Sequence, residues 1–155
     1  EQKVIIRKLN LLPSQHSFFS EIQYKHYKSV FTNKEISLSE KLNITLITSI
    51  ADPNPLINFL KERNNSIHHI KFADHYNYRK KDIYNILSQF NTSKSSKSII
   101  LTTEKDKVKL QYFKKEFENV NLYFIPIKII INNIESFNKQ IVDYVASHKR
   151  IRRFH

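Results

Sequence analysis

The stretch Phe72-Ala73-Asp74-His75-Tyr76-Asn77-Tyr78 decides the fold, together with the apolar run over residues 67–72 that leads into it. The run is typical of a strand, and it stops at an acid and an imidazole, Asp74 and His75. A helical pattern then begins near Asn77. Polar residues at the point where a helix follows a strand are typical of the ligand-binding edge of an α/β domain. The stretch therefore predicts a strand-to-helix turn that presents a polar site.

Further strands are predicted on both sides of this turn. Residues 44–50 form a continuous, mostly β-branched apolar run, which is typical of a strand covered on both faces. Two more strands are expected downstream, over residues 98–102 and 120–125. The apolar residues 127–131 are expected to continue the last strand beyond Pro126.

Apolar residues at helical spacing follow each of these strands. The helix after the first strand has Asn54 as its predicted N-cap and Pro55 as its first helical residue. The predicted apolar helix faces consist of four sets of side chains: Leu56, Phe59 and Leu60; Ile83, Ile86, Leu87 and Phe90; Leu110, Phe113 and Phe117; and Ile134, Phe137, Ile141, Tyr144 and Val145. Because strand and helix alternate, we expect an α/β fold with a mostly parallel sheet and flanking helices.

The first 41 residues do not follow this alternation. Residues 1–12 form either a short helix or a short strand, which ends at Pro13. Residues 18–31 predict an antiparallel strand or hairpin, and the polar residues 32–41 predict a connection. The chain is therefore expected to comprise a linker or hairpin segment (1–41), an α/β domain (42–148) and a basic tail (149–155).

The composition excludes several classes of site. The 155-residue chain contains no Cys, which excludes disulfides, thiolate metal sites and cysteine nucleophiles. It contains no Gly, which excludes a Walker loop or a Gly-rich dinucleotide loop, since both need a backbone that approaches phosphate closely. It contains no Met, and we expect it to be a piece of a longer protein. Its seven His show no metal-ligand spacing, so no metal site is predicted.

The chain is strongly basic, with 26 Lys and Arg against 14 Asp and Glu and a net charge of +12. Two interpretations are open. The charge serves an anionic partner, such as nucleic acid, a membrane surface or a phosphorylated substrate, or it reflects a composition rich in Lys, Asn and Ile. The basic residues are spread along the sequence rather than gathered into one stripe. No stretch approaches the roughly 18 apolar residues of a membrane span.

The loops that follow parallel strands open on one edge of the sheet, where ligands bind. This places a common set of polar residues on that edge, namely Asp52, Asp74, His75, Thr103, Glu104, Lys105 and Asp106. Each loop is weak evidence by itself, whereas three polar loops that each begin where a strand ends are stronger evidence. The sequence therefore predicts a polar rim formed by these loops.

Several of these residues have a structural alternative to a functional role. His75 is either a general base, an orienting partner for a carboxylate, or a hydrogen-bonded structural histidine. Asp74 either holds that imidazole or caps the helix that begins near Asn77. Glu104 and Asp106 lie in a first helical turn, which favours carboxylates whatever their function. Lys105 opposes that preference, which indicates a phosphate or carboxylate partner.

Four features in this order resemble the C-terminal half of the tetraacyldisaccharide 4'-kinases, the lipid A 4'-kinases of Gram-negative bacteria. They are Phe18-Phe19-Ser20-Glu21-Ile22-Gln23-Tyr24, then Ile50-Ala51-Asp52-Pro53-Asn54-Pro55-Leu56, then Phe72-Ala73-Asp74-His75, then Thr103-Glu104-Lys105-Asp106-Lys107-Val108-Lys109-Leu110. The last two are the most specific. The chain departs from the family at Ser49, where a Gly is usual, and at Tyr76, where a second His is common.

The resemblance implies a P-loop kinase-like C-terminal lobe. It implies transfer of the ATP γ-phosphate, with Mg²⁺, to the 4'-hydroxyl of tetraacyldisaccharide 1-phosphate in lipid A biosynthesis. The location implied is the cytoplasmic face of the bacterial inner membrane, with peripheral attachment and no nucleic-acid partner. In this family the phosphate-binding loop, the acidic base and most of the Mg²⁺ and ATP contacts belong to an N-terminal domain, which is absent from this chain.

The resemblance also implies roles for the rim residues. His75, beside Asp74, is the histidine expected to pair with the catalytic acid of the other domain, and Lys105 and Glu104 are expected to line or brace the same cleft. Asp52, Thr103 and Asp106 are assigned to that cleft as well. The competing hypothesis from another class is a basic nucleic-acid-binding α/β module, which predicts a steep salt dependence of binding.

Overall fold

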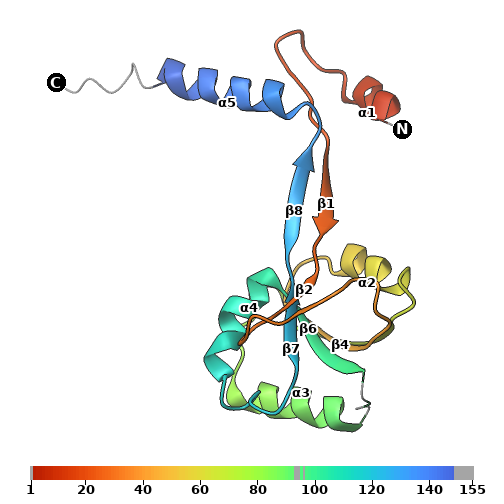
Figure 1. Cartoon of the computed structure of the whole chain (residues 1–155). Helices are drawn as coiled ribbons and strands as arrows, with labels where there is room; N and C mark the ends of the chain where they lie inside the picture. Colours follow the sequence, from red (N-terminus) through yellow and green to blue (C-terminus); the bar gives the residue numbers. More distant parts are fainter. Residues whose placement is uncertain (1, 93–94, 96, 149–155) are drawn as a thin grey trace, which may run out of the picture. The chain divides into compact units, whose positions relative to one another are not determined.

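A six-stranded sheet organises residues 24–127, the larger of two compact units into which the chain divides (Figure 1). The structure is a computed structural model that describes residues 2–92, 95 and 97–148. Neighbouring strands follow the order β3-β2-β7-β6-β4-β5. The strands are β2 (Tyr27–Ser29), β3 (Glu35–Ile36), β4 (Asn43–Thr48), β5 (Ser66–Lys71), β6 (Ser98–Thr103) and β7 (Leu122–Ile125).

The sheet is mostly parallel, which confirms the predicted fold class. β4 pairs in parallel with β5 and with β6, and β6 pairs in parallel with β7. β2 is antiparallel to β7 and to β3, so the antiparallel pairing is confined to one side of the sheet. β4 and β6 are buried along almost their whole length, as expected for strands covered on both faces.

Helices cover both faces of this sheet. They are α2 (Asn54–Lys61), α3 (Lys80–Thr92) and α4 (Glu104–Leu110), which continues into a 3₁₀ turn (Gln111–Phe113). On one face, Leu56 and Leu60 of α2 pack against Ile44 and Leu46 of β4. On the other face, the side chains of α3 and α4 pack against Ile47 and Ile100. The alternation along β4 therefore places successive residues in two separate cores.

Two predicted helix starts are wrong. Asn54 is the first helical residue of α2 rather than its N-cap, which is Pro53. α3 begins at Lys80 instead of near Asn77, so Asp74 does not cap it. At the start of α3 the Arg79 N–H donates to Asp82 Oδ2 at 2.8 Å, so Asp82 rather than Asp74 satisfies a free N–H there, and the Tyr76 hydroxyl donates to the same oxygen at 3.1 Å.

The rings of Tyr76 and Tyr78 also pack on Phe72, with ring centroids 4.8 and 5.0 Å apart. Aromatic contacts of this kind contribute about 1 kcal/mol each beyond buried area. They stabilise residues 73–79 as an ordered connection between β5 and α3, which a simple count of helical periodicity does not detect.

Of the two alternatives predicted for residues 18–31, the antiparallel strand is confirmed and the hairpin is wrong. β1 (Ser20–Tyr24) and β2 follow each other closely in sequence, yet they belong to different sheets. β1 pairs instead with β8 (Ile127–Ile131), and the two strands run in opposite directions (Figure 1). β8 therefore does not extend β7, because the chain changes sheets at Pro126, which has no N–H to donate to a ladder.

The smaller unit comprises residues 1–23 and 128–155. It holds most of the β1–β8 ribbon, the helix α1 (Gln2–Leu9), which settles the open alternative at residues 1–12, and the helix α5 (Ile134–His148). Phe18 packs edge-on against Phe137, with ring centroids 5.2 Å apart. Many apolar side chains of α1 and α5 are exposed, namely Val4, Ile5, Ile6, Leu9, Ile134, Ile141, Val142, Tyr144 and Val145.

This division differs from the expected segments. β2 and β3 were assigned to the connecting segment 1–41, but they pair within the larger sheet. The predicted tail, residues 149–155, lies outside the described residues. No helix in the described part of the chain combines the length and the apolar character needed to cross a bilayer.

Replacing Phe90 with Ala tests the core beneath α3. Phe90 is 1% exposed, and its loss should lower the free energy of unfolding by about 3–5 kcal/mol, because a cavity is added to the lost transfer free energy. Urea denaturation followed by circular dichroism measures the change. Tyr112→Ala is the matched control, since that ring is 79% exposed and its removal should change stability by about 0.5 kcal/mol or less. Equal effects of the two substitutions would contradict the assigned packing.

Candidate functional site

The candidate site lies where β4, β5 and β6 end at the same edge of the sheet. Their parallel register pairs Thr48 with Lys71 and Ile47 with Thr102, so the loops that follow are neighbours. The connection through α2 leads from β4 to β5 on one side, and the connection through α3 leads to β6 on the other side. The carboxyl ends of β4 and β6 therefore form a topological switch point, which is where open α/β sheets bind ligands.

The loop after β5 is a tight turn with His75 in an unusual conformation. The Tyr76 N–H donates to the Ala73 carbonyl at 3.1 Å, which closes the turn. His75 has φ = 58°, in the left-handed region. Its N–H lies 3.0 Å from Asp74 Oδ1 and 3.2 Å from the Ser49 carbonyl oxygen. The backbone at His75 is thus held by its own loop and by the loop after β4.

The left-handed backbone at position 75 makes it notable that a histidine occupies this position. The left-handed conformation costs about 1–2 kcal/mol for a residue with a Cβ, and Asn tolerates it better than most. Among the described residues, the other positive φ values all belong to Asn, at Asn10, Asn64 and Asn133. His75 is therefore the one described residue with positive φ that is not an Asn. A histidine in a turn position that the chain otherwise fills with Asn is expected to serve through its imidazole.

Asp74 lies between the side chains of Lys105 and His75. Its Oδ1 accepts a hydrogen bond from Lys105 Nζ at 2.9 Å, and its Oδ2 lies 3.6 Å from His75 Nε2. The hydrogen bond from Lys105 is the main cause that holds the pKa of Asp74 below its usual value, with the charges of His75 and Lys105 adding to the effect. Lys105 therefore has one of the two partners predicted for it, a carboxylate. The His75 side chain is 78% exposed, so its ring is accessible to a group outside this unit.

The start of α4 forms the second part of the site. Thr103 is the N-cap of α4, and its hydroxyl accepts a hydrogen bond from the Asp106 N–H at 3.1 Å. Asp106 is fully buried, so its carboxylate packs between the ends of β4 and β6 and does not face solvent. Its Oδ2 accepts from the Ser49 N–H at 2.7 Å, and its Oδ1 accepts from the Ser49 hydroxyl.

The two remaining predicted residues lie on the same edge but have local contacts. Asp52 is exposed, and its Oδ1 accepts the Asn54 N–H at 3.0 Å at the start of α2. Glu104 is exposed in the first turn of α4. The structure thus brings Asp74, His75 and Lys105 into one group. It joins Thr103 and Asp106 to Ser49 in a second group.

Sequence reasoning missed three contributors to this site. Lys109 donates from Nζ to the Tyr76 carbonyl oxygen at 2.7 Å, and its position four residues after Lys105 on α4 was the signal that could have identified it. Ser49 is the second, because its N–H and its hydroxyl both donate to Asp106. The Tyr78 hydroxyl is buried near Ser49 and Asp106, although it has no hydrogen bond of standard geometry within the described residues. Burial and, next, the Asp106 charge raise the pKa of Tyr78, while a weaker polar contact with Ser49 opposes the shift.

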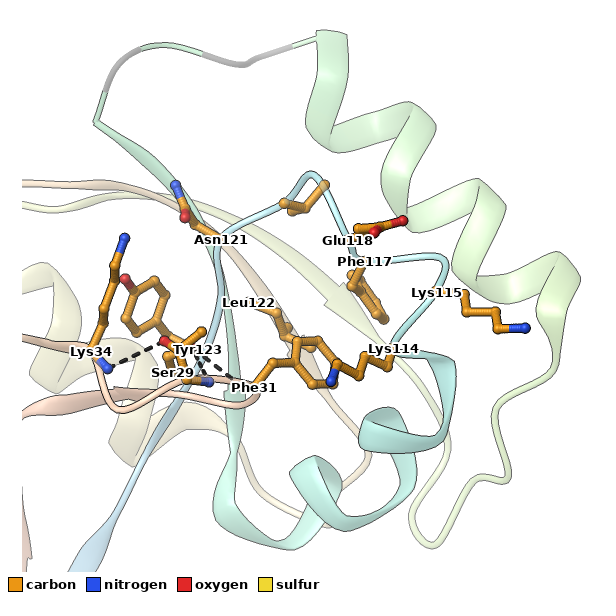
Figure 2. Close-up of a pocket in the computed structure, with 12 residues that line it drawn as sticks. Ser29, Phe31, Lys34, Lys114, Lys115, Phe117, Glu118, Asn121, Leu122 and Tyr123 are labelled. Carbon is orange, nitrogen blue, oxygen red and sulfur yellow. Dashed lines mark hydrogen bonds between the residues drawn. The ribbon is translucent and has the colours of Figure 1, made fainter.

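A cavity of about 430 Å³ lies at the opposite edge of the sheet, beside the start of β7 (Figure 2). Phe31 and Phe117 form part of its apolar lining, and Lys34 and Lys114 lie on its wall. None of the rim residues predicted from the sequence is among the residues that line it. The cavity is therefore separate from the candidate site.

Taken together, the sheet order, the switch point and the polar loops define an α/β protein with a polar candidate site at the ends of β4, β5 and β6. The family model described as tetraacyldisaccharide-1-P 4'-kinase matches residues 3–146. The chain belongs to this family, which confirms the predicted resemblance and favours it over the nucleic-acid-binding alternative.

Curated relatives carry the same name. The tetraacyldisaccharide 4'-kinase of Bacteroides fragilis is 31% identical over 161 residues, a match that covers 97% of this chain and 43% of the relative. That of Bacteroides thetaiotaomicron is 33% identical over 165 residues, with the same two coverages. The chain therefore spans less than half the length of these relatives.

A solved structure supports the fold. The crystal structure of the apo form of LpxK from Aquifex aeolicus in complex with ATP matches with a TM-score of 0.51 and 21% identity. The match covers 86% of this chain and 38% of that chain. At this level of identity the likeness supports the α/β fold, and it is consistent with a chain that corresponds to part of its relatives.

Replacing Lys105 with Gln tests the ion pair at the turn. The substitution removes the charged donor to Asp74 Oδ1, so the pKa of Asp74 should rise toward its usual value. A carboxyl pKa that is depressed in the folded state contributes stability above the unfolded-state pKa, and this stability is lost as pH falls through the folded-state pKa. NMR titration of the Asp74 carboxyl carbon measures the change.

Lys107→Gln is the control for this titration. Lys107 lies on the same helix, but its Nζ lies over the Phe124 ring, 4.1 Å from the ring centroid. Its replacement should leave the pKa of Asp74 unchanged. An Asp74 titration that is identical in wild type and in Lys105→Gln would show that this ion pair does not persist in solution.

Proposed function

We propose that the protein containing this chain transfers the γ-phosphate of ATP to the 4'-hydroxyl of tetraacyldisaccharide 1-phosphate, a step of lipid A biosynthesis. The observation that carries the proposal is the family match over residues 3–146. The relatives that cover 97% of the chain bear the name of this kinase, and the solved neighbour is described in complex with ATP. Because the chain spans 43% of those relatives, the complete reaction needs groups that it does not supply by itself.

His75 is the residue of this chain proposed to act in the reaction. Phosphoryl transfer depends on positioning and on balanced charge, so an imidazole that orients an acidic base is a suitable contribution from a second domain. The exposed ring and the strained turn beneath it support this role. Asp74 steadies the imidazole, and Lys105 compensates the charge of Asp74. The acid that His75 would orient belongs to the part of the relatives that lies outside this chain.

Other members of the rim have supporting roles in this proposal. Asp52 and Glu104 are exposed and would face the substrate or nucleotide cleft, while Thr103 holds the start of α4. Mg²⁺ bridges the transferred phosphates in kinases. We assign Mg²⁺ to the part of the enzyme that lies outside this chain, as the family resemblance implies.

The substrate class also supports a location. A kinase whose acceptor is an acylated disaccharide must reach a membrane surface, and the chain carries a net charge of +12 that favours anionic headgroups. Peripheral attachment at the cytoplasmic face of the bacterial inner membrane, where ATP is available, fits both features.

His75→Asn tests the proposed role. Asn tolerates the left-handed backbone, so the turn should persist while the imidazole is lost. The test uses a chimera in which this chain replaces the matching segment of the Bacteroides thetaiotaomicron relative. Turnover, measured as transfer of radiolabelled γ-phosphate to the disaccharide, should fall about 10²-fold or more, the usual contribution of acid–base catalysis.

His68→Asn is the matched control. His68 lies in β5, where its Nε2 is 2.9 Å from Gln89 Oε1, and its replacement should leave turnover unchanged. Undiminished activity of the His75→Asn chimera would remove the role assigned to His75. A chimera that folds and binds ATP but transfers no phosphate to the disaccharide would contradict the proposed function itself.

A further inference from the structure

The buried carboxylate of Asp106 has a role that neither the family match nor the fold assigns. Within the described residues it is the only charged side chain that is buried, with 0% of its surface exposed. Burying a carboxylate is costly unless hydrogen bonds satisfy it. Three donors do so here, namely the Ser49 N–H, the Ser49 hydroxyl and the Thr103 hydroxyl. Both Asp106 oxygens are therefore used, and two of the three bonds reach across from α4 to the end of β4.

Ser49 connects this carboxylate to the turn that holds His75. The residue is fully buried, its N–H donates to Asp106 Oδ2 at 2.7 Å, and its carbonyl oxygen accepts the His75 N–H at 3.2 Å. One peptide segment is thus fixed on one side by Asp106 and on the other side by the backbone of His75. A shift of Ser49 would move or release the His75 N–H.

The His75 backbone needs such a support. Its φ of 58° lies in a region that is unfavourable for a residue with a Cβ, so the turn persists only where surrounding contacts determine it. The bond to Ser49 is the contact from the His75 N–H to another loop, whereas the bond to Asp74 Oδ1 is local. The position of the imidazole therefore depends on the loop after β4.

The Ser49 side chain takes part in this link as well. Ser49 is not among the described residues with positive φ, so its backbone does not require glycine. Its hydroxyl adds a further donor to Asp106. The side chain therefore strengthens the link between the end of β4 and α4.

We propose that Asp106 is a positioning residue for His75, which it holds in place through Ser49. Asp106 does not touch substrate; it sets where the end of β4 lies, and that segment carries the His75 backbone. The link can be measured without substrate, whereas its effect on turnover rests on the proposed kinase function.

Two substitutions of Asp106 separate hydrogen bonding from packing. Asp106→Leu keeps the branched shape and enlarges the side chain, as the Asn65→Leu control below also does, but it leaves the Ser49 N–H and the Thr103 hydroxyl without their acceptor. Asp106→Asn keeps one acceptor oxygen for those two donors, and its amide NH₂ can donate to the Ser49 hydroxyl, which then reverses its role. The structure thus predicts loss of the link in the first variant and rescue in the second.

The first readout is amide hydrogen exchange of His75 by NMR in the 155-residue chain. Asp106→Leu should speed this exchange about tenfold or more, and Asp106→Asn should stay within about threefold of wild type. Asn65→Leu is the matched control, because Asn65 is also buried and bridges the Leu42 N–H and the Leu60 carbonyl oxygen at the start of the sheet. It should destabilise the fold without selective exchange at His75.

The second readout is kinetic and uses the chimera with the Bacteroides thetaiotaomicron relative. Asp106→Leu should lower kcat about tenfold to a hundredfold while KM for ATP stays within about twofold, since a misplaced group affects the transition state more than ground-state binding. Asp106→Asn should retain most of kcat. An inactive parent chimera would count against the proposed function. The link between Asp106 and His75 would then be tested by the hydrogen-exchange readout alone.

Three outcomes would overturn the proposal. They are His75 exchange in Asp106→Leu no faster than in Asn65→Leu, an Asp106→Asn variant as impaired as Asp106→Leu, and a kcat that does not change. If Asp106→Leu does not fold, Thr103→Val removes one donor to Asp106 and the N-cap acceptor for the Asp106 N–H at nearly constant volume, and it should speed His75 exchange about threefold. Unchanged exchange in Thr103→Val would then overturn the proposal.

Discussion

The parallel pairing of β4 with both β5 and β6 is the constraint on which the remaining structure depends. Because β4 lies between the strands that follow it in sequence, the chain must cross the sheet once, from β5 to β6. That crossing places α2 on one face and α3 and α4 on the other, and it divides the apolar residues of β4 between two cores. It also brings three strand ends to one edge. The polar loops then meet there, and every contact of the candidate site follows from that arrangement.

A chain without glycine must form its tight turns with other residues, and this need shapes the site. Within the described residues, positive φ values occur at three Asn and at His75. The turn at His75 is stabilised by the Ser49 carbonyl, by Asp74, and by the aromatic packing of Tyr76 and Tyr78 on Phe72. Loss of conformational freedom at this position is thus offset by contacts from neighbouring elements. The result is an imidazole on a fixed backbone that still projects into solvent.

We interpret this site as part of a larger one, because the chain spans less than half the length of its relatives. The chain provides a histidine, a carboxylate and a lysine in a short series. The relatives that it matches are more than twice as long as the chain. In the proposed role, His75 of this lobe orients the acidic base and Lys105 compensates the charge of Asp74. Hydrogen bonds through Ser49 join the loops of the lobe. The exposed apolar side chains on α1 and α5 belong to the smaller unit.

The sequence by itself determined the α/β class, the four parallel strands to within a few residues, and the loops that carry the polar rim. Periodicity and strand ends are local properties, so a single chain reveals them. The partner of β1, the separation of β8 from β7 and the late start of α3 required the tertiary structure, because strand pairing and aromatic packing join residues distant in sequence. The burial of Asp106 is the clearest case. In the sequence it is one of several carboxylates at a helix start, and only the close approach of Ser49 across 57 positions of sequence encloses it and connects it to His75.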